Sequence, residues 1–219
     1  MVKIGLIKYP INKEFFESKK EEYWYFLGLV SSDGYISDDV VEIRLNKKDG
    51  QILTKLRDLI CPGKPIYDKK ATHSKQLSIH SKDVCAHLKL QLGMKSNKKH
   101  IEIVYPSVPD KMLKHYIRGL IDGDGCIDTT KAYRENKAYI GPRLRILGNR
   151  QFLVDMLDDI RKHIPNKTKS VNKKGSEGVW YVTYNFSIAK NILEWCYIEN
   201  NICIFRKYNK FKEVCEMKI

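Results

Sequence analysis

Several features that mark other classes of protein are missing from this sequence. It has no apolar run long enough to cross a membrane, and its first ten residues, MVKIGLIKYP, lack the apolar stretch and small-residue cleavage site of a secretory signal. Its six cysteines include no CxxC pair and show no regular spacing, which argues against a disulfide framework or a zinc ribbon. These absences predict an intracellular protein with reduced thiols and no membrane anchor.

Acidic residues are scarce relative to basic ones. The chain has 40 Lys and Arg against 26 Asp and Glu, which gives a formal net charge of +14. This excess is larger than solubility requires and has the sign that phosphate backbones attract, so nucleic acid is the first partner to consider. The length of 219 residues and the hydrophobic content of 42% allow one large core or two small ones.

The chain contains an internal repeat. Residues 26–36, FLGLVSSDGYI, match residues 117–127, IRGLIDGDGCI, so that each matched pair lies 91 positions apart (117 − 26). A repeat predicts two copies of one structural unit rather than a single irregular domain.

The segments that follow the two copies also correspond. After a polar and apolar alternation, each half has a helix-like segment, at 51–60 and at 151–160. A second strand pattern then enters a helix at 77–82 and at 186–191. The sequence therefore predicts an α+β fold built from two αββαββα units related by a pseudo-twofold axis.

The boundary between the units is expected in the segment YPSVP at residues 105–109. Its two prolines interrupt the helical and strand patterns and favour extended geometry at the residues before them. The predicted units are therefore residues 1–105 and 106–219, and Asp110 is expected to cap the helix that carries the second copy.

The strands that follow the motifs have two different faces. Val41, Ile43 and Leu45 alternate with polar residues, and Trp180, Val182 and Tyr184 do the same in the second half. A period of two predicts antiparallel sheets with one face on the helices and one polar face.

Each repeated motif places small residues one helical turn apart, just before an acid. The small residues are Gly28 with Ser32 and Gly119 with Gly123, and they allow two helix backbones to approach closely. Each helix then ends in an acid, Asp33 or Asp124, followed by a glycine that is expected to end the helix in the left-handed conformation.

The two acids are predicted to need a cation. Carboxylates at helix C-termini oppose the helix dipole, and two of them side by side repel each other. Hard oxygen ligands that leave positions open for water and phosphate favour Mg²⁺, which can activate water for phosphodiester hydrolysis.

On these two motifs the chain resembles the LAGLIDADG homing endonucleases of the monomeric, two-motif type. The resemblance implies a DNA-binding saddle of two antiparallel sheets, with the motif helices at the centre. It also implies a staggered double-strand break in a long asymmetric target of double-stranded DNA, with no obligate protein partner. The metal-binding acids of the family correspond to Asp33 and Asp124, with Mg²⁺ or Mn²⁺ supporting cleavage and Ca²⁺ binding without it. The first motif departs from the family pattern at Ser31 and Ser32, where an acid and a Gly or Ala are commoner.

The resemblance also places polar and basic side chains around the metal site. One such position, at the end of the second strand, falls on Asn46, next to Lys47, and in the second half on Gly148 and Asn149. The position after the third helix falls at Lys98 and Lys99, and on Lys207 after Arg206. We expect Asn46, Lys99 and Lys207 to assist catalysis by orienting water or stabilising developing charge.

The polar faces of the sheets are expected to bind DNA, because an antiparallel ribbon fits the major groove. In the second half, the segment at 131–141 lengthens the repeat and is expected to form a longer DNA-facing hairpin. The predicted base-reading residues are Glu42, Arg44, Gln76, Ser78 and His80 in the first repeat and Arg143, Arg145, Tyr181, Thr183 and Asn185 in the second. The lysines expected to contact phosphates include Lys69, Lys75, Lys167 and Lys169.

Other functions fit the sequence less well. An RNA maturase or a DNA-binding regulator on the same fold has no need of two acids facing phosphate. A nuclease of the PD-(D/E)xK type would use Asp110 with Glu135 and Lys137, but that pattern is short and common by chance. A complete intein would need a terminal Asn, and a ribosomal or chromatin protein would not explain the duplicated acidic motif.

Overall fold

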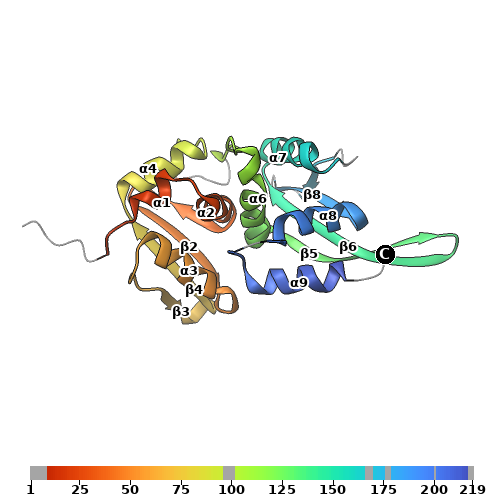
Figure 1. Cartoon of the computed structure of the whole chain (residues 1–219), viewed down its shortest axis with the longest axis horizontal. Coiled ribbons are helices and arrows are strands. Elements are labelled where there is room, and N and C mark those ends of the chain that lie inside the picture. The colour runs from red at the N-terminus through yellow and green to blue at the C-terminus, as the bar shows by residue number, and fades with distance from the viewer. Residues whose placement is uncertain (1–8, 96–101, 166–169, 176–178, 200, 217–219) are drawn as a thin grey trace, which may run out of the picture.

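A computed structural model describes residues 9–95, 102–165, 170–175, 179–199 and 201–216. Two halves, each an antiparallel sheet with helices, lie on either side of a central pair of helices, α2 (Glu21–Asp33) and α6 (Asp110–Asp124) (Figure 1). This arrangement confirms the predicted α+β fold with its two similar units. None of the described helices is both long and apolar enough to cross a bilayer.

The first half follows the predicted element order. After the short helix α1 (Lys13–Glu17) and the motif helix α2, the chain forms a sheet with strand order β1-β2-β4-β3. Its remaining elements are β1 (Gly34–Ile36), β2 (Val40–Asn46), η1 (Lys47–Asp49), α3 (Gln51–Ile60), β3 (Tyr67–Lys69), η2 (Lys70–Thr72), β4 (Ser74–His80) and α4 (Lys82–Gln91).

The second half repeats this topology with the sheet order β5-β6-β8-β7. Its elements after α6 are β5 (Cys126–Arg134), β6 (Lys137–Gly148), α7 (Arg150–His163), β7 (Asn172–Lys174), β8 (Val179–Asn185), α8 (Phe186–Tyr197) and α9 (Phe205–Cys215).

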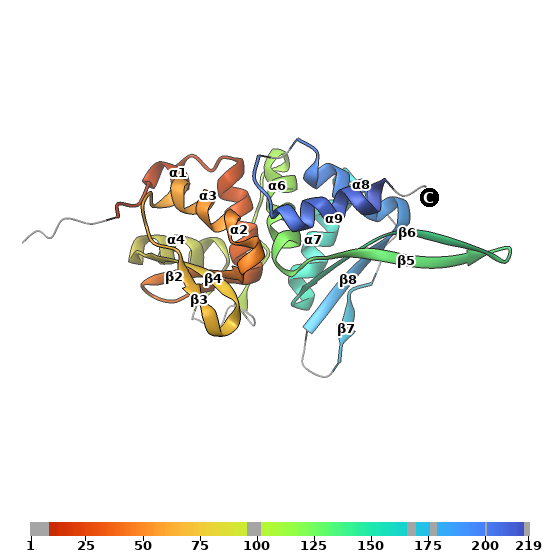
Figure 2. The same ribbon diagram turned by 90° about the horizontal axis from the view of Figure 1, so that it is seen from below.

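The lengthened segment at 131–141 forms the outer part of the β5–β6 hairpin, which projects far from the rest of the molecule (Figures 1 and 2). Glu135 and Asn136 make its turn with φ values of 47° and 62°, the geometry that suits a two-residue hairpin loop. The acids of the PD-(D/E)xK pattern do not lie on neighbouring strands, because Glu135 is in this turn and Asp110 begins α6.

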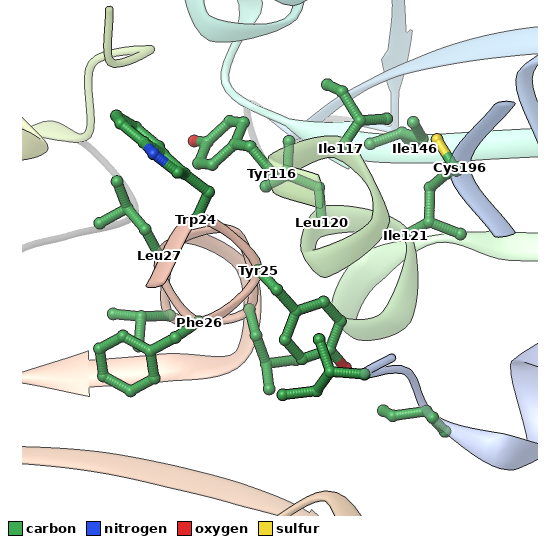
Figure 3. Packing of buried hydrophobic residues seen from close by; sticks show 14 of the residues in the cluster. Trp24, Tyr25, Phe26, Leu27, Tyr116, Ile117, Leu120, Ile121, Ile146 and Cys196 are labelled. Atoms are coloured by element: carbon green, nitrogen blue, oxygen red, sulfur yellow. The ribbon is translucent and has the colours of Figure 1, made fainter. Parts of the chain in front are cut away.

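Each sheet packs its apolar face against helices. In α3, Ile52, Leu53, Leu56 and Ile60 are all buried, since they recur at the spacing that lines one side of a helix. The motif helices are more deeply enclosed: every residue of α2 from Tyr23 to Ser31 is buried. Figure 3 shows how Trp24, Tyr25, Tyr116 and Leu120 fill the space where α2 and α6 meet.

Two local expectations about the motif helices were wrong. Gly34 and Gly125 follow the helices in extended conformations, with φ of −81° and −74°, rather than in the left-handed one. Glycine is required there by close approach instead, because a Cβ on Gly34 would lie 2.6 Å from the Val30 carbonyl oxygen and one on Gly125 would lie 2.5 Å from that of Ile121. Asp110 is the first residue of α6 and makes no capping hydrogen bond; the N-cap position belongs to Pro109.

Candidate active site at the helix crossing

The motif helices pack backbone to backbone through their small residues. A Cβ added to Gly28 would lie 3.1 Å from the Cα of Gly119, and one added to Gly119 would lie 3.0 Å from the carbonyl carbon of Gly28. One turn further on, a Cβ at Gly123 would overlap the Ser32 side chain and lie 3.3 Å from the Asp33 Oδ2 atom. The contacts advance in the same direction along both helices, so the helices are parallel and their acid-bearing ends lie together.

The same pseudo-symmetry governs the hydrogen bonds between the helices. The Tyr25 hydroxyl of α2 donates to the Asp122 Oδ2 atom of α6 at 2.7 Å, while the Tyr116 hydroxyl of α6 lies 3.1 Å from the Ser31 hydroxyl of α2. These four residues occupy matched positions of the repeat, because Tyr25 corresponds to Tyr116 and Ser31 to Asp122. The departure at Ser31 is therefore accommodated by a weaker, neutral version of the same link.

Asp33 and Asp124 are both exposed at the ends of their helices, where the chain turns into the first strand of each sheet. Their side chains therefore stand at the junction of the helix pair and the two sheets. Among the described residues no group of three or more His, Cys, Asp and Glu side chains converges as a metal site. Two exposed carboxylates suit a cation such as Mg²⁺, which keeps several waters and binds through one or two carboxylates plus phosphate oxygens.

Asp122 is buried beside the exposed pair and has a different environment. Its carboxylate accepts hydrogen bonds from the Tyr197 hydroxyl at 2.5 Å and the Ile204 N–H at 2.6 Å, in addition to that from Tyr25. Desolvation by burial raises the pKa of Asp122 to about 6, although these three donors lower it. Asp122 thus ties the α8–α9 region and α2 to the end of the second motif helix.

We predict that Asp122→Asn lowers the free energy of unfolding by about 1–3 kcal/mol, because the new amide group would present its own N–H groups to donors in a buried site. Urea unfolding without divalent metal measures this change. The matched control is Asp58→Asn, whose carboxylate lies on the surface beside Arg57. Equal stabilities of the two variants would contradict the structural role of Asp122.

Lys207, which was expected to assist catalysis near the two acids, is buried. Its ammonium group is buried at the C-terminal end of α6 and donates to the backbone oxygens of Ile121, at 3.2 Å, and Gly125. Burial lowers the pKa of Lys207, while nearby Asp122 raises it. A cation here offsets the negative end of the helix dipole next to Asp124.

The neighbouring Arg206 joins the two halves of the molecule. Its guanidinium group binds both oxygens of buried Asp49, with the shortest distance 2.7 Å, and Asp49 belongs to the turn η1 that follows β2. Sequence reasoning missed this pair because 157 positions separate the residues.

The other expected catalytic positions are only partly described. Asn46 is exposed at the end of β2, where its Oδ1 atom accepts a hydrogen bond from the Lys48 N–H at 3.0 Å. Asn149 of the second half instead caps α7 through the Phe152 N–H. Lys98 and Lys99 lie outside the described residues, as do Lys167 and Lys169.

The polar face of the first sheet brings most of its predicted base-reading residues together. Arg44 Nε and Nη2 both donate to the Gln76 Oε1 atom, at 3.2 and 2.9 Å. The Gln76 Nε2 and Ser78 Oγ atoms donate to the Glu42 Oε1 atom, at 2.5 and 2.9 Å. Gln76 and Ser78 are buried, so their side chains hold the more exposed Arg44 and Glu42 in place on this face.

The strand register shows on which face of the sheet the other residues predicted to contact DNA lie. His80, paired with Val40, and Lys69, paired with Ser74, are both exposed. Lys75 pairs with Leu45 and therefore lies on the helix-packed face, against the expectation that it faces DNA. Sequence reasoning also missed Tyr35 and Tyr67, which are about half exposed and share the polar face through their pairing with Glu42 and Gln76.

The second sheet presents a similar polar face. Arg143 pairs with Asn185, Arg145 with Thr183 and Leu147 with Tyr181, so all the predicted reading residues of this half share one face. A hollow of about 530 Å³ is lined by four of them, Arg143, Arg145, Tyr181 and Thr183, together with Cys126, Leu147 and Lys174. The alternate residues Trp180, Val182 and Tyr184 face the helices, as their period of two predicts.

Comparisons with known proteins bear directly on this arrangement. Neither family models nor characterised proteins match the sequence. Solved structures do match in fold: I-LtrWI bound to target DNA has a TM-score of 0.60 at 14% identity, covering 90% of this chain and 91% of that one. I-AabMI bound to uncleaved DNA has a TM-score of 0.62 at 13% identity, covering 88% of both chains.

I-SmaMI bound to cleaved DNA matches with a TM-score of 0.59 at 14% identity, covering 88% of this chain and 87% of that one. Another I-SmaMI structure contains an uncleaved DNA target in the presence of calcium ions. These likenesses show that the chain has the fold of the LAGLIDADG homing endonucleases, which confirms the resemblance found in the two motifs.

Proposed function

We propose that this chain, which has the LAGLIDADG homing endonuclease fold, is a monomeric site-specific endonuclease. It makes a staggered double-strand break in a long asymmetric target of double-stranded DNA, by hydrolysis of one phosphodiester bond in each strand. The observation that carries the proposal is the parallel packing of α2 and α6, which brings the exposed acids Asp33 and Asp124 together between the two polar sheet faces.

Asp33 and Asp124 would hold Mg²⁺ or Mn²⁺, with Ca²⁺ binding without supporting cleavage. The bound metal would supply Lewis-acid activation of water and of the scissile phosphate. The carboxylates fit this purpose because they are exposed, whereas buried Asp122 already accepts three hydrogen bonds from the protein.

The other residues around the site have distinct roles. Lys207 holds the end of α6 and reduces the repulsion between Asp124 and its neighbours, so it acts as a positioning residue. The Asp49–Arg206 ion pair holds the start of α9 against η1, the turn that follows Asn46. At the end of β2, the Asn46 amide would orient water. Lys99 remains a candidate on the sequence pattern alone.

The two repeats, residues 1–105 and 106–219, would each bind one half of the target. Arg44 and Glu42 would read bases from the first sheet, and Arg143, Arg145 and Thr183 from the second. Because these side chains differ and only the second sheet has the long β5–β6 hairpin, the two halves of the target should differ in sequence and in length. The net charge of +14 supplies attraction to the phosphate backbone.

Incubation with a randomised duplex library and Mg²⁺, followed by sequencing of the cut ends, tests the function. We expect both strands to be cut at one non-palindromic sequence, with a fixed stagger, and sedimentation of the complex to show one protein chain per duplex. Recovery of no cut ends would contradict nuclease activity. A palindromic site bound by two chains would contradict a single chain that carries both acids.

A further inference from the structure

A carboxylate that sequence reasoning did not single out organises the polar face of the second sheet. Asp128 of β5 accepts hydrogen bonds from Arg143 Nε and Nη2 of β6, both at 2.7 Å, in a two-point arrangement. The same carboxylate accepts a hydrogen bond from Arg145 Nη2 at 3.0 Å. One acid thus holds two arginines that are neighbours on this face.

Asp128, Arg143 and Arg145 form a cluster whose charge and partial exposure suit a binding surface rather than a core ion pair. The side chains of Asp128, Arg143 and Arg145 are 30%, 31% and 39% exposed. The hydrogen bond from Arg143 lowers the pKa of Asp128, so the acid is ionised at neutral pH. The three side chains together carry one net positive charge, and both arginines line the hollow over the sheet.

The two-point bond to Asp128 leaves a defined edge of Arg143 for a ligand. Because Nε and Nη2 face the acid, the edge formed by Nη1 and Nη2 remains for a second planar acceptor. A guanine presents such an acceptor pair, O6 and N7, in the major groove, and arginine is its commonest specific partner.

The spacing of the two arginines also suits stacked bases. Residues two apart on a strand are separated by about 6.6 Å, while successive base pairs are about 3.4 Å apart along the duplex. Arg143 and Arg145 can therefore reach bases within about two steps of each other when β6 follows the groove.

The first sheet shows the same device with a neutral partner. Arg44 Nε and Nη2 both donate to the single Gln76 Oε1 atom, whereas those of Arg143 donate to the two oxygens of Asp128. Gln76 is itself held by hydrogen bonds to Glu42 and Ser78. Orientation of a reading arginine by a second side chain therefore occurs on both halves, although the two holding residues differ in charge.

We propose that Asp128 is a specificity-determining positioning residue, which sets Arg143 and Arg145 to read guanines at two nearby positions in the half of the target bound by the second repeat. The inference rests on the proposed DNA-binding function but not on cleavage. It predicts opposite effects on affinity and on specificity, because removal of the acid frees the arginines and also removes a negative charge that faces DNA.

The test is selection of bound duplexes from a randomised library, without divalent metal, by the wild type and by Asp128→Asn. We expect the wild type to select guanine at two positions within about two steps. The variant should lose roughly tenfold of its discrimination at those positions only, while its affinity for a random duplex rises. The charge-matched control, Asp158→Asn on α7, should keep the wild-type preferences, because its acid pairs with Arg161 on the surface.

Two results would overturn the proposal. One is an Asp128→Asn variant that selects the same guanines as stringently as the wild type. The other is a uniform loss of affinity for all duplexes, which a merely structural role of Asp128 would produce. A wild type that selects guanines but cuts no DNA with Mg²⁺ would refute the nuclease function and leave the role of Asp128 standing.

Discussion

Gly119→Leu is expected to lower the free energy of unfolding by about 3 kcal/mol or more, at the upper end of the cost of overpacking. A Cβ at this position would overlap the Tyr25 carbonyl oxygen and lie 2.8 Å from the Leu29 nitrogen. The obstacle is backbone rather than a flexible side chain, so the helices themselves must separate. Gly28→Leu should behave alike, because its Cβ would overlap the Tyr116 carbonyl oxygen.

Chemical unfolding of the wild type and the glycine variants measures this effect. Lys111→Leu is the matched control, since it adds the same side chain to an exposed position of α6. The control should stay within about 0.5 kcal/mol of the wild type, as most surface substitutions do. If Gly119→Leu were equally stable, the close crossing of α2 and α6 would be wrong.

The sequence was most informative where a structural feature depends on residues close together in the chain and occurs in both repeats. Gly28 and Gly119 are each followed one turn later by a small residue, and that spacing alone predicted a close helix crossing. The period of two around Val41 and Val182 likewise predicted which side chains face the helices. Both patterns depend only on positions near each other in the chain, which the geometry of a helix or strand relates directly.

Long-range hydrogen bonds could not be predicted in this way. The three donors to Asp122 come from Tyr25, Tyr197 and Ile204, which are 97, 75 and 82 positions away in the sequence. Tyr25 belongs to the other repeat, while Tyr197 and Ile204 reach Asp122 only when the second repeat folds. Asp122 and Asp124 are both acids in the last turn of the second motif helix. Burial is what separates their roles.

Strand pattern also could not distinguish the exposed side chains of a polar face from the buried side chains that hold them. Gln76 and Arg44 lie on the same polar face, but Gln76 is buried beneath its neighbours and Arg44 is exposed. Asp128 was missed because its role depends on contacts with two arginines of the neighbouring strand, which the pattern of β5 alone does not reveal. The role of Asp128 follows only from the short distances between its carboxylate and Arg143 and Arg145.

Asp33→Asn and Asp124→Asn are each expected to abolish double-strand cleavage, with a loss of at least about a hundredfold in rate. The substitution removes a ligand charge but keeps the volume of the side chain, so the cation is held less tightly between the helix ends. Because both acids are exposed, folding should be retained. Binding of the target should also persist, since the proposed contacts to DNA lie on the sheets and removal of a carboxylate lessens repulsion of phosphate.

The most direct test of metal-dependent cleavage at the helix crossing measures cutting and binding side by side, on the target recovered from the library. The wild type, Asp33→Asn, Asp124→Asn and the charge-matched Asp158→Asn are compared in Mg²⁺ and in EDTA. We expect the wild type and Asp158→Asn to cut only in Mg²⁺, and both motif variants to bind the target at wild-type affinity without making a double-strand break. Wild-type cleavage rates in the two motif variants would contradict the assignment of Asp33 and Asp124 as the metal-binding acids.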